Sequence, residues 1–142
     1  MLSELRVGEF LAALGERTPT PASGAATALT GALAAGLTEL AARFAGDEDA
    51  VVRAKAAVTR LLELADEDAE AYRAFMADRN EATRARIIAV PEEIAVQADE
   101  VAELAERARA QLRSSVAGDA EAAAELARAA ARVARRLAEL NE

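Results

Sequence analysis

Residues 18–37 read TPTPASGAATALTGALAAGL, and this stretch decides how the chain folds. Each of its two prolines pushes the preceding residue out of the α region, so residues 18–21 are predicted to be extended or turned. After Pro21 no side chain is larger than leucine, and the apolar spacing is helical. A helix with so little side-chain volume allows another helix, or a ligand, to come close to its backbone.

The small residues of the helix predicted over residues 23–45 fall on one broad side of it: Gly24, Ala28, Gly31, Ala32, Ala35 and Gly36. Three glycines in a helix cost about 1 kcal/mol each relative to alanine, so close packing or a ligand must offset them. The start of this helix also presents free backbone N–H groups and the positive end of the helix dipole. Two interpretations stay open, a binding site for an anion or polar ring edge and a capped, tightly packed helix.

Charge and composition exclude several classes of function. The chain has 142 residues, enough for one core, with 25 acidic against 17 basic side chains and a formal net charge of -8. Nucleic acid is therefore not expected as a partner. The absence of cysteine and histidine excludes disulfides, thiolate and imidazole metal sites, and Ser-His catalysis. Any chemistry must use carboxylates, lysine, tyrosine, hydroxyls, backbone dipoles and water.

Alanine occupies 41 of the 142 positions, so the hydrophobic share of 53% overstates the core. Because alanine buries little area, we expect much of the stability to come from packing against a second copy, as a homodimer. Charges at Glu4, Arg6 and Glu9 interrupt the N-terminal segment, and no window approaches eighteen uninterrupted apolar residues. The expectation is a soluble, cytoplasmic protein without a membrane segment.

Stop and start signals divide the N-terminal half into helices. The first helix is predicted to begin at Ser3 and to end at Gly15, and the second to end at Gly46. Asp47 is predicted to cap a third helix, which ends at a turn around residues 79 and 80.

A fourth helical region contains Pro91, which predicts either a kink or a joint between two helices. Gly118 and Asp119 are predicted to separate it from a last helix that ends near Leu140. No stretch predicts a strand. The fold class is therefore an all-α, antiparallel bundle of about five helices in a single domain, residues 1–142.

Three blocks of the sequence resemble one known family. They are EFLAALGERTPTPASGAATALTGALAAGLTELAARF at residues 9–44, LLELADEDAEAYRAFM at residues 61–76 and VPEEIA at residues 90–95. The family is that of cyclodeaminase and methenyltetrahydrofolate cyclohydrolase, the all-α domain type found at the C-terminus of formiminotransferase-cyclodeaminase. Positions in register with its pattern include Phe10, Pro21, Gly24, Ala28, Gly31, Asp68, Tyr72, Met76, Pro91, Asp119 and Asn141.

The sequence departs from the family pattern at the turn before the second helix. The family has Pro-Gly-Gly-Gly-Ser there, whereas Ala22 and Ser23 replace the first two glycines and Ala25 replaces the serine. If the glycines let a pterin ring approach the backbone, Ala22 partly blocks that approach.

The resemblance implies an enzyme of folate one-carbon metabolism, a hydrolase or lyase. It would hydrolyse 5,10-methenyltetrahydrofolate to 10-formyltetrahydrofolate, or cyclise formiminotetrahydrofolate with release of ammonia. Neither reaction requires a metal or a redox cofactor, and the folate derivative is the substrate. The alternative is a shortened, non-catalytic relative that binds a folate-like ligand or forms a structural helical dimer.

The family match suggests Asp68 and Asp119 as catalytic residues, and Pro21, Ser23, Gly24 and Tyr72 as substrate-binding residues. The helix of Asp68 turns an apolar face inward, and a partly buried carboxylate has a raised pKa suited to proton transfer. Each residue also has a structural interpretation: Asp68 in a solvated acidic run, Tyr72 in the core and Asp119 as a helix cap.

Two features near the C-terminus have alternative interpretations. Asn141 matches the asparagine that ends the family pattern, but it lies next to the end of the sequence. The basic stripe of Arg128, Arg132, Arg135 and Arg136 could hold the glutamate tail of a folate, or pair with nearby glutamates.

Overall fold

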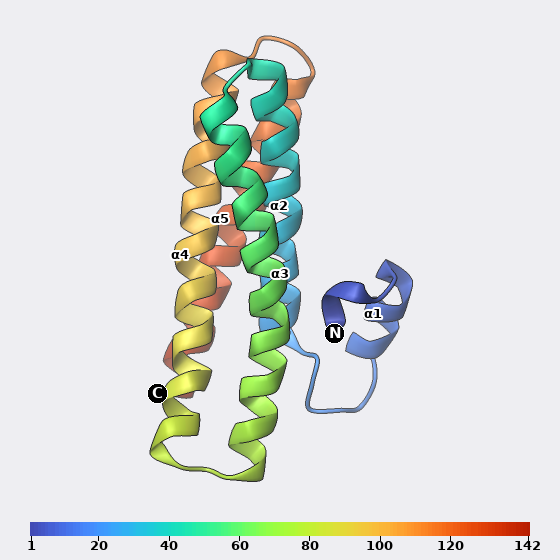
Figure 1. Ribbon diagram of the computed structural model, residues 1–142, viewed down its shortest axis with the longest axis vertical. Helices are drawn as coiled ribbons and strands as arrows, with labels where there is room; N and C mark the ends of the chain where they lie inside the picture. The colour runs from blue at the N-terminus through green and yellow to red at the C-terminus, as the bar shows by residue number, and fades with distance from the viewer.

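The computed structural model describes all residues, 1–142, and consists of α-helices with one short 3-10 helix. The elements are η1 (Leu2–Glu4), α1 (Val7–Leu14), α2 (Ser23–Ala45), α3 (Glu48–Ala77), α4 (Glu81–Gln111) and α5 (Val116–Asn141). Helices α2 to α5 lie side by side and alternate in direction (Figure 1). The predicted all-α fold of about five helices is confirmed, with α2 to α5 forming the antiparallel bundle and α1 lying outside it.

The helices of the bundle differ in length, and this difference makes room for a site. Helices α3 and α4 have 30 and 31 residues, whereas α2 and α5 have 23 and 26. The α3–α4 hairpin therefore extends beyond the start of α2 and the end of α5 (Figure 1). The resulting step brings the first turn of α2 and the last turn of α5 against the sides of α3 and α4.

Alanine fills most of the core, with a few large side chains between the helices. The largest fully buried side chains include Leu61, Leu64, Ile94 and Leu104. A Cβ on Gly31 would lie 3.2 Å from Leu61 Cδ1, so this glycine lets α3 approach α2 closely. Five of the six small residues predicted on one side of α2 are buried; Gly36 is exposed.

The predicted bounds of α2 are confirmed, together with the capping of α3. Gly46 follows α2 with a φ of 69°, a left-handed conformation that glycine adopts without a steric penalty. The Asp47 carboxylate accepts a hydrogen bond from the Ala50 N–H at 3.1 Å. Pro91 lies inside α4 and does not divide it into two helices.

Two predicted helix starts are wrong. Ser3 does not cap α1, which begins at Val7, because the Ser3 hydroxyl donates to Asp66 Oδ2 instead. Gly118 and Asp119 do not separate the last two helices. Helix α5 begins at Val116 and contains both in its first turns, where Asp119 interacts favourably with the helix dipole.

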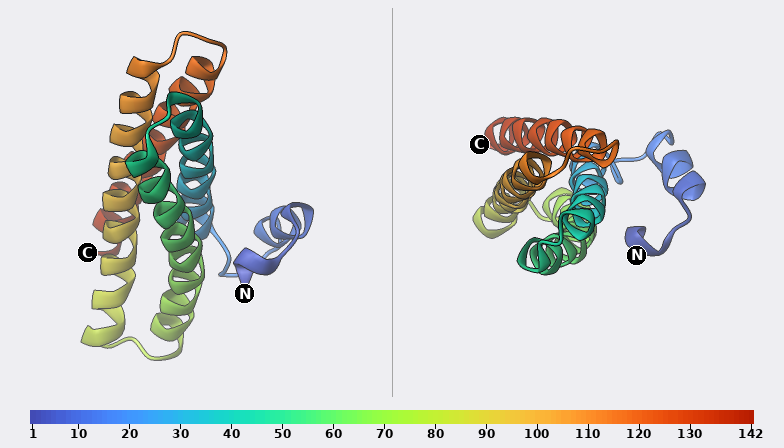
Figure 2. Two further views of the ribbon diagram at one scale, coloured as in Figure 1. Left: turned by 45° about the horizontal axis from the view of Figure 1, so that its top comes forward. Right: turned by 90° about the horizontal axis from the view of Figure 1, so that it is seen from above.

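Residues 1–22 form an N-terminal arm that stands beside the bundle (Figure 2). Two hydrogen bonds to the buried carboxylate of Asp66 hold its beginning on α3. The Leu2 N–H donates at 2.6 Å and the Ser3 hydroxyl at 3.1 Å. Phe10 of α1 is buried in the main apolar cluster.

Helix α2 is long and apolar enough to cross a membrane by length and composition alone. In the fold, 56% of its most apolar window is buried, and α2 contacts α3, α4 and α5. These contacts give it the place of a core helix in the bundle.

Candidate functional site

A cavity of about 200 Å³ lies at the step where α2 begins and α5 ends. Its wall combines the turn before α2 with one face of each bundle helix. The lining residues are Pro19, Thr20, Ala22, Ser23, Gly24, Asp68, Tyr72, Ile87, Pro91, Leu137 and Asn141. The fold thus brings together residues that are up to 122 positions apart, from Pro19 to Asn141.

The carboxylate of Asp68 packs directly against the backbone of Gly24. A Cβ built on Gly24 would overlap with both carboxylate oxygens of Asp68. Glycine is therefore required at position 24 for this carboxylate to reach the first turn of α2. Both residues were predicted as site residues, and the structure places them in contact.

Burial changes the acidity of Asp68. Removal from water raises the pKa of its carboxyl from 3.8 to about 6. Desolvation is the one cause of this shift, and no hydrogen bond or ion pair from another residue lowers the pKa again. A carboxyl with this pKa exchanges protons readily near neutral pH, which suits a general acid or base.

The first turn of α2 offers hydrogen-bond donors to the same cavity. Ala22 is the N-cap and provides no side-chain hydrogen bond, so the first N–H groups of the helix are uncapped. The first backbone hydrogen bond of α2 is donated by the Ala26 N–H to the Ala22 carbonyl, so the N–H groups before Ala26 have no partner within the helix. The cavity thus has donors from α2 on one side and the Asp68 carboxyl on α3.

Of the residues predicted to bind substrate, Tyr72, Ser23 and Gly24 line the cavity, whereas Pro21 does not. Tyr72 is half-buried one turn after Asp68 on α3. Pro21 shapes the turn that leads into α2, while its neighbours Thr20 and Ala22 face the cavity.

The structure does not bring Asp119 to this site. Asp119 lies in the first turn of α5, whereas the cavity is lined by Asn141 at the last turn. The 22 residue steps from Asp119 to Asn141 span roughly 33 Å of helix. Asp119 and Asp68 therefore do not act together within one chain.

Asn141 is not among the site residues predicted from the sequence, but it lies in the wall of the cavity. Its side-chain amide donates to the backbone O of Ile87 at 2.8 Å. Ile87 lies four residues before Pro91 on α4, and both line the cavity. A proline inside a helix leaves the carbonyl four residues earlier without its donor. Pro91 therefore predicts that the Ile87 carbonyl needs a donor from outside α4, but the sequence does not indicate that Asn141 is that donor.

Three of the four arginines of the basic stripe on α5 form ion pairs. Arg128 pairs with Glu106 of α4 at 2.9 Å, Arg135 pairs with Asp99 of α4, and Arg136 pairs with Glu139 at 3.3 Å. Two other arginines form no ion pair and donate to residues that line the cavity. Arg73 donates to Thr20 Oγ1 at 3.5 Å, and Arg84 donates to the backbone O of Asn141 at 3.2 Å.

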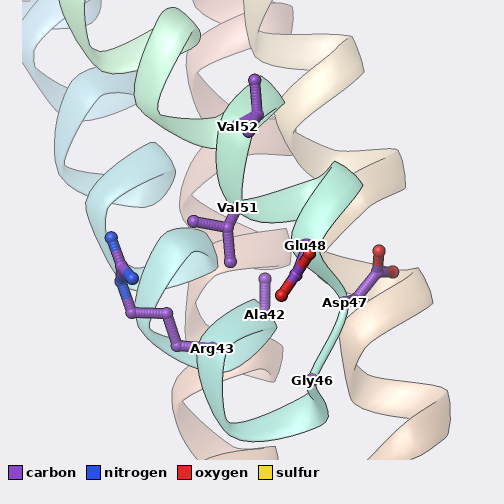
Figure 3. A pocket seen from close by; sticks show the side chains of 7 residues that line it. All are labelled: Ala42, Arg43, Gly46, Asp47, Glu48, Val51 and Val52. Atoms are coloured by element: carbon purple, nitrogen blue, oxygen red, sulfur yellow. The ribbon is translucent and has the colours of Figure 1, made fainter.

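Two further hollows are less suited to polar chemistry. One of about 450 Å³ lies at the α2–α3 connection (Figure 3). Its charged residues are partly engaged elsewhere, since Arg43 pairs with Glu39, and Asp47 caps α3 and pairs with Arg107. The other, a groove of about 700 Å³ between the N-terminal arm and helices α2 and α3, is lined almost entirely by apolar residues.

No group of three or more carboxylates in the structure is arranged to hold a metal ion. The cavity contains a single carboxyl, that of Asp68. Its chemistry is therefore that of one proton-exchanging group beside helix N–H donors and a tyrosine.

Comparisons with known proteins agree with the fold. The family model described as formiminotransferase-cyclodeaminase matches residues 6–142. Among solved structures, formiminotetrahydrofolate cyclodeaminase from Thermotoga maritima is similar, with a TM-score of 0.92 and 25% sequence identity. The similarity covers 99% of this chain and 80% of that one. No curated protein sequence matches the chain.

Proposed function

Because the chain belongs to the formiminotransferase-cyclodeaminase family, we propose that it binds a tetrahydrofolate derivative in the Asp68 cavity and converts its one-carbon unit. The observation that carries the proposal is the desolvated Asp68 carboxyl held against Gly24 at the start of α2. The proposal includes no metal or redox cofactor and places the reaction in the cytoplasm.

The cavity is sized for part of a folate. Sites for drug-sized ligands have volumes of about 300–1,000 Å³, and this one has about 200 Å³. We assign it to the pterin ring and the reacting carbon, with the rest of the molecule outside. Arg73 and Arg84 donate to residues of the cavity wall and form no ion pair, so their guanidinium groups could pair with the carboxylates of the glutamate tail. Replacing both by alanine should raise KM for a polyglutamylated substrate more than for the monoglutamate.

Asp68 would serve two related reactions. In hydrolysis, water attacks the methenyl carbon and Asp68 takes one proton from that water, which is then released to solvent. The remaining hydroxyl proton passes to N5 as the bond between the carbon and N5 breaks, which gives 10-formyltetrahydrofolate. In cyclisation, N10 attacks the carbon of the protonated formimino group, and the N10 proton passes to the leaving nitrogen, which departs as ammonia and leaves the methenyl cation. With a pKa of about 6, Asp68 is mostly ionised at pH 7 and stabilises the cationic species of either path.

The test follows the absorbance of 5,10-methenyltetrahydrofolate and the release of ammonia from formiminotetrahydrofolate. The wild type should consume at least one of these substrates, and Asp68→Asn should lower the rate at least about 100-fold. Asp119→Asn is the matched control, because it makes the same chemical change far from the cavity. Absence of turnover by the wild type, or equal rates for the wild type and Asp68→Asn, contradicts catalysis at this site.

One observation favours the alternative of a non-catalytic binding protein. Ala22 lines the cavity at a position where the family pattern has glycine, and its methyl group restricts approach of a flat ring to the backbone. Thermal stabilisation by folates without turnover would support this alternative. Absence of any shift would leave only a structural role for the bundle.

We also propose that the protein is a homodimer. The apolar groove beside α2 combines Leu33 of α2 with Val7 and Leu11 of α1, and all three side chains are exposed. A second copy packed on this groove would cover them and supplement an alanine-rich core.

A further inference from the structure

Pro91 creates an unmet hydrogen-bond requirement in the wall of the cavity. In an α-helix the carbonyl of each residue accepts from the N–H four residues later. Helix α4 continues through Pro91, which has no N–H, so the carbonyl of Ile87 has no donor within the helix. Ile87 is buried, and an unpaired buried carbonyl is costly.

Asn141 supplies the missing donor from another helix. Its Nδ2 lies 2.8 Å from the backbone O of Ile87. A carbonyl oxygen only accepts, so the amide must present nitrogen rather than oxygen to it. This hydrogen bond fixes the orientation of the amide and leaves Oδ1 without a partner from the chain.

The backbone around Asn141 is held as well. Arg84 of α4 donates to the Asn141 carbonyl at 3.2 Å, so two hydrogen bonds join this residue to α4. Asn141 lines the cavity together with Ile87 and Pro91, and Asp68 lines it from α3. The cavity therefore contains an amide oxygen in a fixed orientation in addition to a carboxyl.

We propose that Asn141 is a substrate-binding residue whose Oδ1 accepts a hydrogen bond from the donor edge of the substrate ring. This inference rests on the proposed function, which supplies the ring. The 2-amino-4-oxopyrimidine part of a pterin carries a ring N–H and an amino group on adjacent positions. An amide oxygen that cannot exchange places with its nitrogen discriminates in favour of such donors and against acceptors.

Pro91 offers a way to separate the structural role of Asn141 from its binding role. Pro91→Ala restores an N–H that can pair with the Ile87 carbonyl inside α4, so the donor of Asn141 is no longer needed for stability. The second lone pair of that carbonyl can still accept from Asn141 and orient the amide. Pro91 itself lines the cavity, and the effect of Asn141→Ala on binding is therefore measured separately with proline and with alanine at position 91.

The experiment uses four proteins: wild type, Asn141→Ala, Pro91→Ala and the double variant. Urea unfolding measures stability, and titration calorimetry measures binding of 5-formyltetrahydrofolate and of its analogue without the 2-amino group. Asn141→Ala should lower stability only where Pro91 is present. It should weaken binding of 5-formyltetrahydrofolate about tenfold in both backgrounds, a change of roughly 1.4 kcal/mol, and should reduce the preference over the desamino analogue.

Three results overturn the inference, and they are distinguishable. Equal binding by wild type and Asn141→Ala removes the binding role while the proposed function stands. Loss of affinity only in the Pro91 background shows that Asn141 acts through the Ile87 carbonyl alone. Absence of binding by the wild type contradicts the folate proposal itself, and the assignment of Asn141 with it. Asn141→Asp, which retains acceptor oxygens without the donor, repeats the comparison if Asn141→Ala fails to fold.

Discussion

Burial of the Asp68 carboxyl couples the chemistry of the cavity to the stability of the fold. Its pKa is about 6 in the folded protein against an ordinary value of 3.8, so the folded state retains a proton that the unfolded chain has released. The contribution of Asp68 to stability is therefore fully present below about pH 4 and is lost as the pH rises through about 6.

Asp68→Asn should remove this pH dependence. Urea unfolding of the wild type should show a loss of stability on the order of 1–3 kcal/mol between pH 4 and pH 7 that the variant does not share. At pH 7 the variant should be the more stable protein. Parallel stability curves for the two proteins over this range would mean that the carboxyl is not desolvated.

The same proton equilibrium should appear in the rates. If the ionised carboxylate is the working form, kcat/KM should rise with pH through about 6, the pKa of Asp68 in the free protein. Asp119→Asn should leave this profile unchanged, because Asp119 lies at the other end of α5. A profile that is flat between pH 5 and pH 8 would count against Asp68 as the titrating group.

Gly24 has a steric role that can be tested with a matched glycine. Gly24→Ala would place a methyl group on the Asp68 carboxylate, so we expect a loss of about 1–3 kcal/mol in unfolding free energy and of folate binding. Gly118→Ala meets no atom within 4 Å and should be neutral or stabilising by up to about 1 kcal/mol. Urea unfolding compares the two variants, and equal effects would show that the Asp68 contact does not constrain position 24.

At the residue scale, the sequence indicated some site residues and not others for physical reasons. Asp68, Gly24, Ser23 and Tyr72 lie in blocks where the family pattern is specific, and all four line the cavity. Asp119 matched a pattern of alanine-rich helix, which carries little information about position in space. The contact between Gly24 and Asp68 joins residues 44 positions apart on two helices, so no local pattern predicts it.

At the scale of elements, the accuracy of the predicted bounds follows the strength of local signals. Helix α2 lies between a proline turn and a left-handed glycine, and both of its ends were predicted correctly. The start of α1 was predicted wrongly, because Ser3 donates to Asp66, a residue 63 positions away, instead of capping the helix. The start of α5 was also predicted wrongly, because Gly118 lies inside the first turns of this helix instead of before it.

The N-terminal arm depends on Asp66 for its attachment to α3. Asp66→Ala removes both acceptor oxygens and leaves the Leu2 N–H and the Ser3 hydroxyl without a partner. We expect faster hydrogen exchange and proteolysis within residues 1–22, with little change in the exchange of α4 and α5. Ser3→Ala, which removes only the longer bond, should have a smaller effect. Unchanged exchange in the arm of Asp66→Ala would show that apolar contacts alone hold it.

At the scale of the whole molecule, two kinds of contact join the helices: ion pairs between charged side chains, and close packing of small side chains. Arg60 of α3 pairs with Glu93 of α4, Arg107 of α4 pairs with Asp47, and Arg128 of α5 pairs with Glu106. Exposed pairs of this kind contribute about 0–1 kcal/mol each to the free energy of unfolding. They therefore affect how the helices are aligned more than how stable the protein is. Stability must come from the close approach that glycine and alanine permit, and from any surface that a partner covers.

The homodimer proposal predicts different effects for the same substitution at two exposed apolar positions. Leu33 of α2 is 68% exposed and lines the apolar groove, whereas Val96 of α4 is 61% exposed and lies outside it. Leu33→Glu should convert the dimer to a monomer and lower the melting temperature, because it places a charge in an apolar interface. Val96→Glu should remain dimeric with nearly the melting temperature of the wild type. Light scattering coupled to size exclusion, over a range of protein concentrations, measures the oligomeric state of both variants and of the wild type. A monomeric wild type, or a dimer that persists in Leu33→Glu, would show that the groove is not an interface between copies.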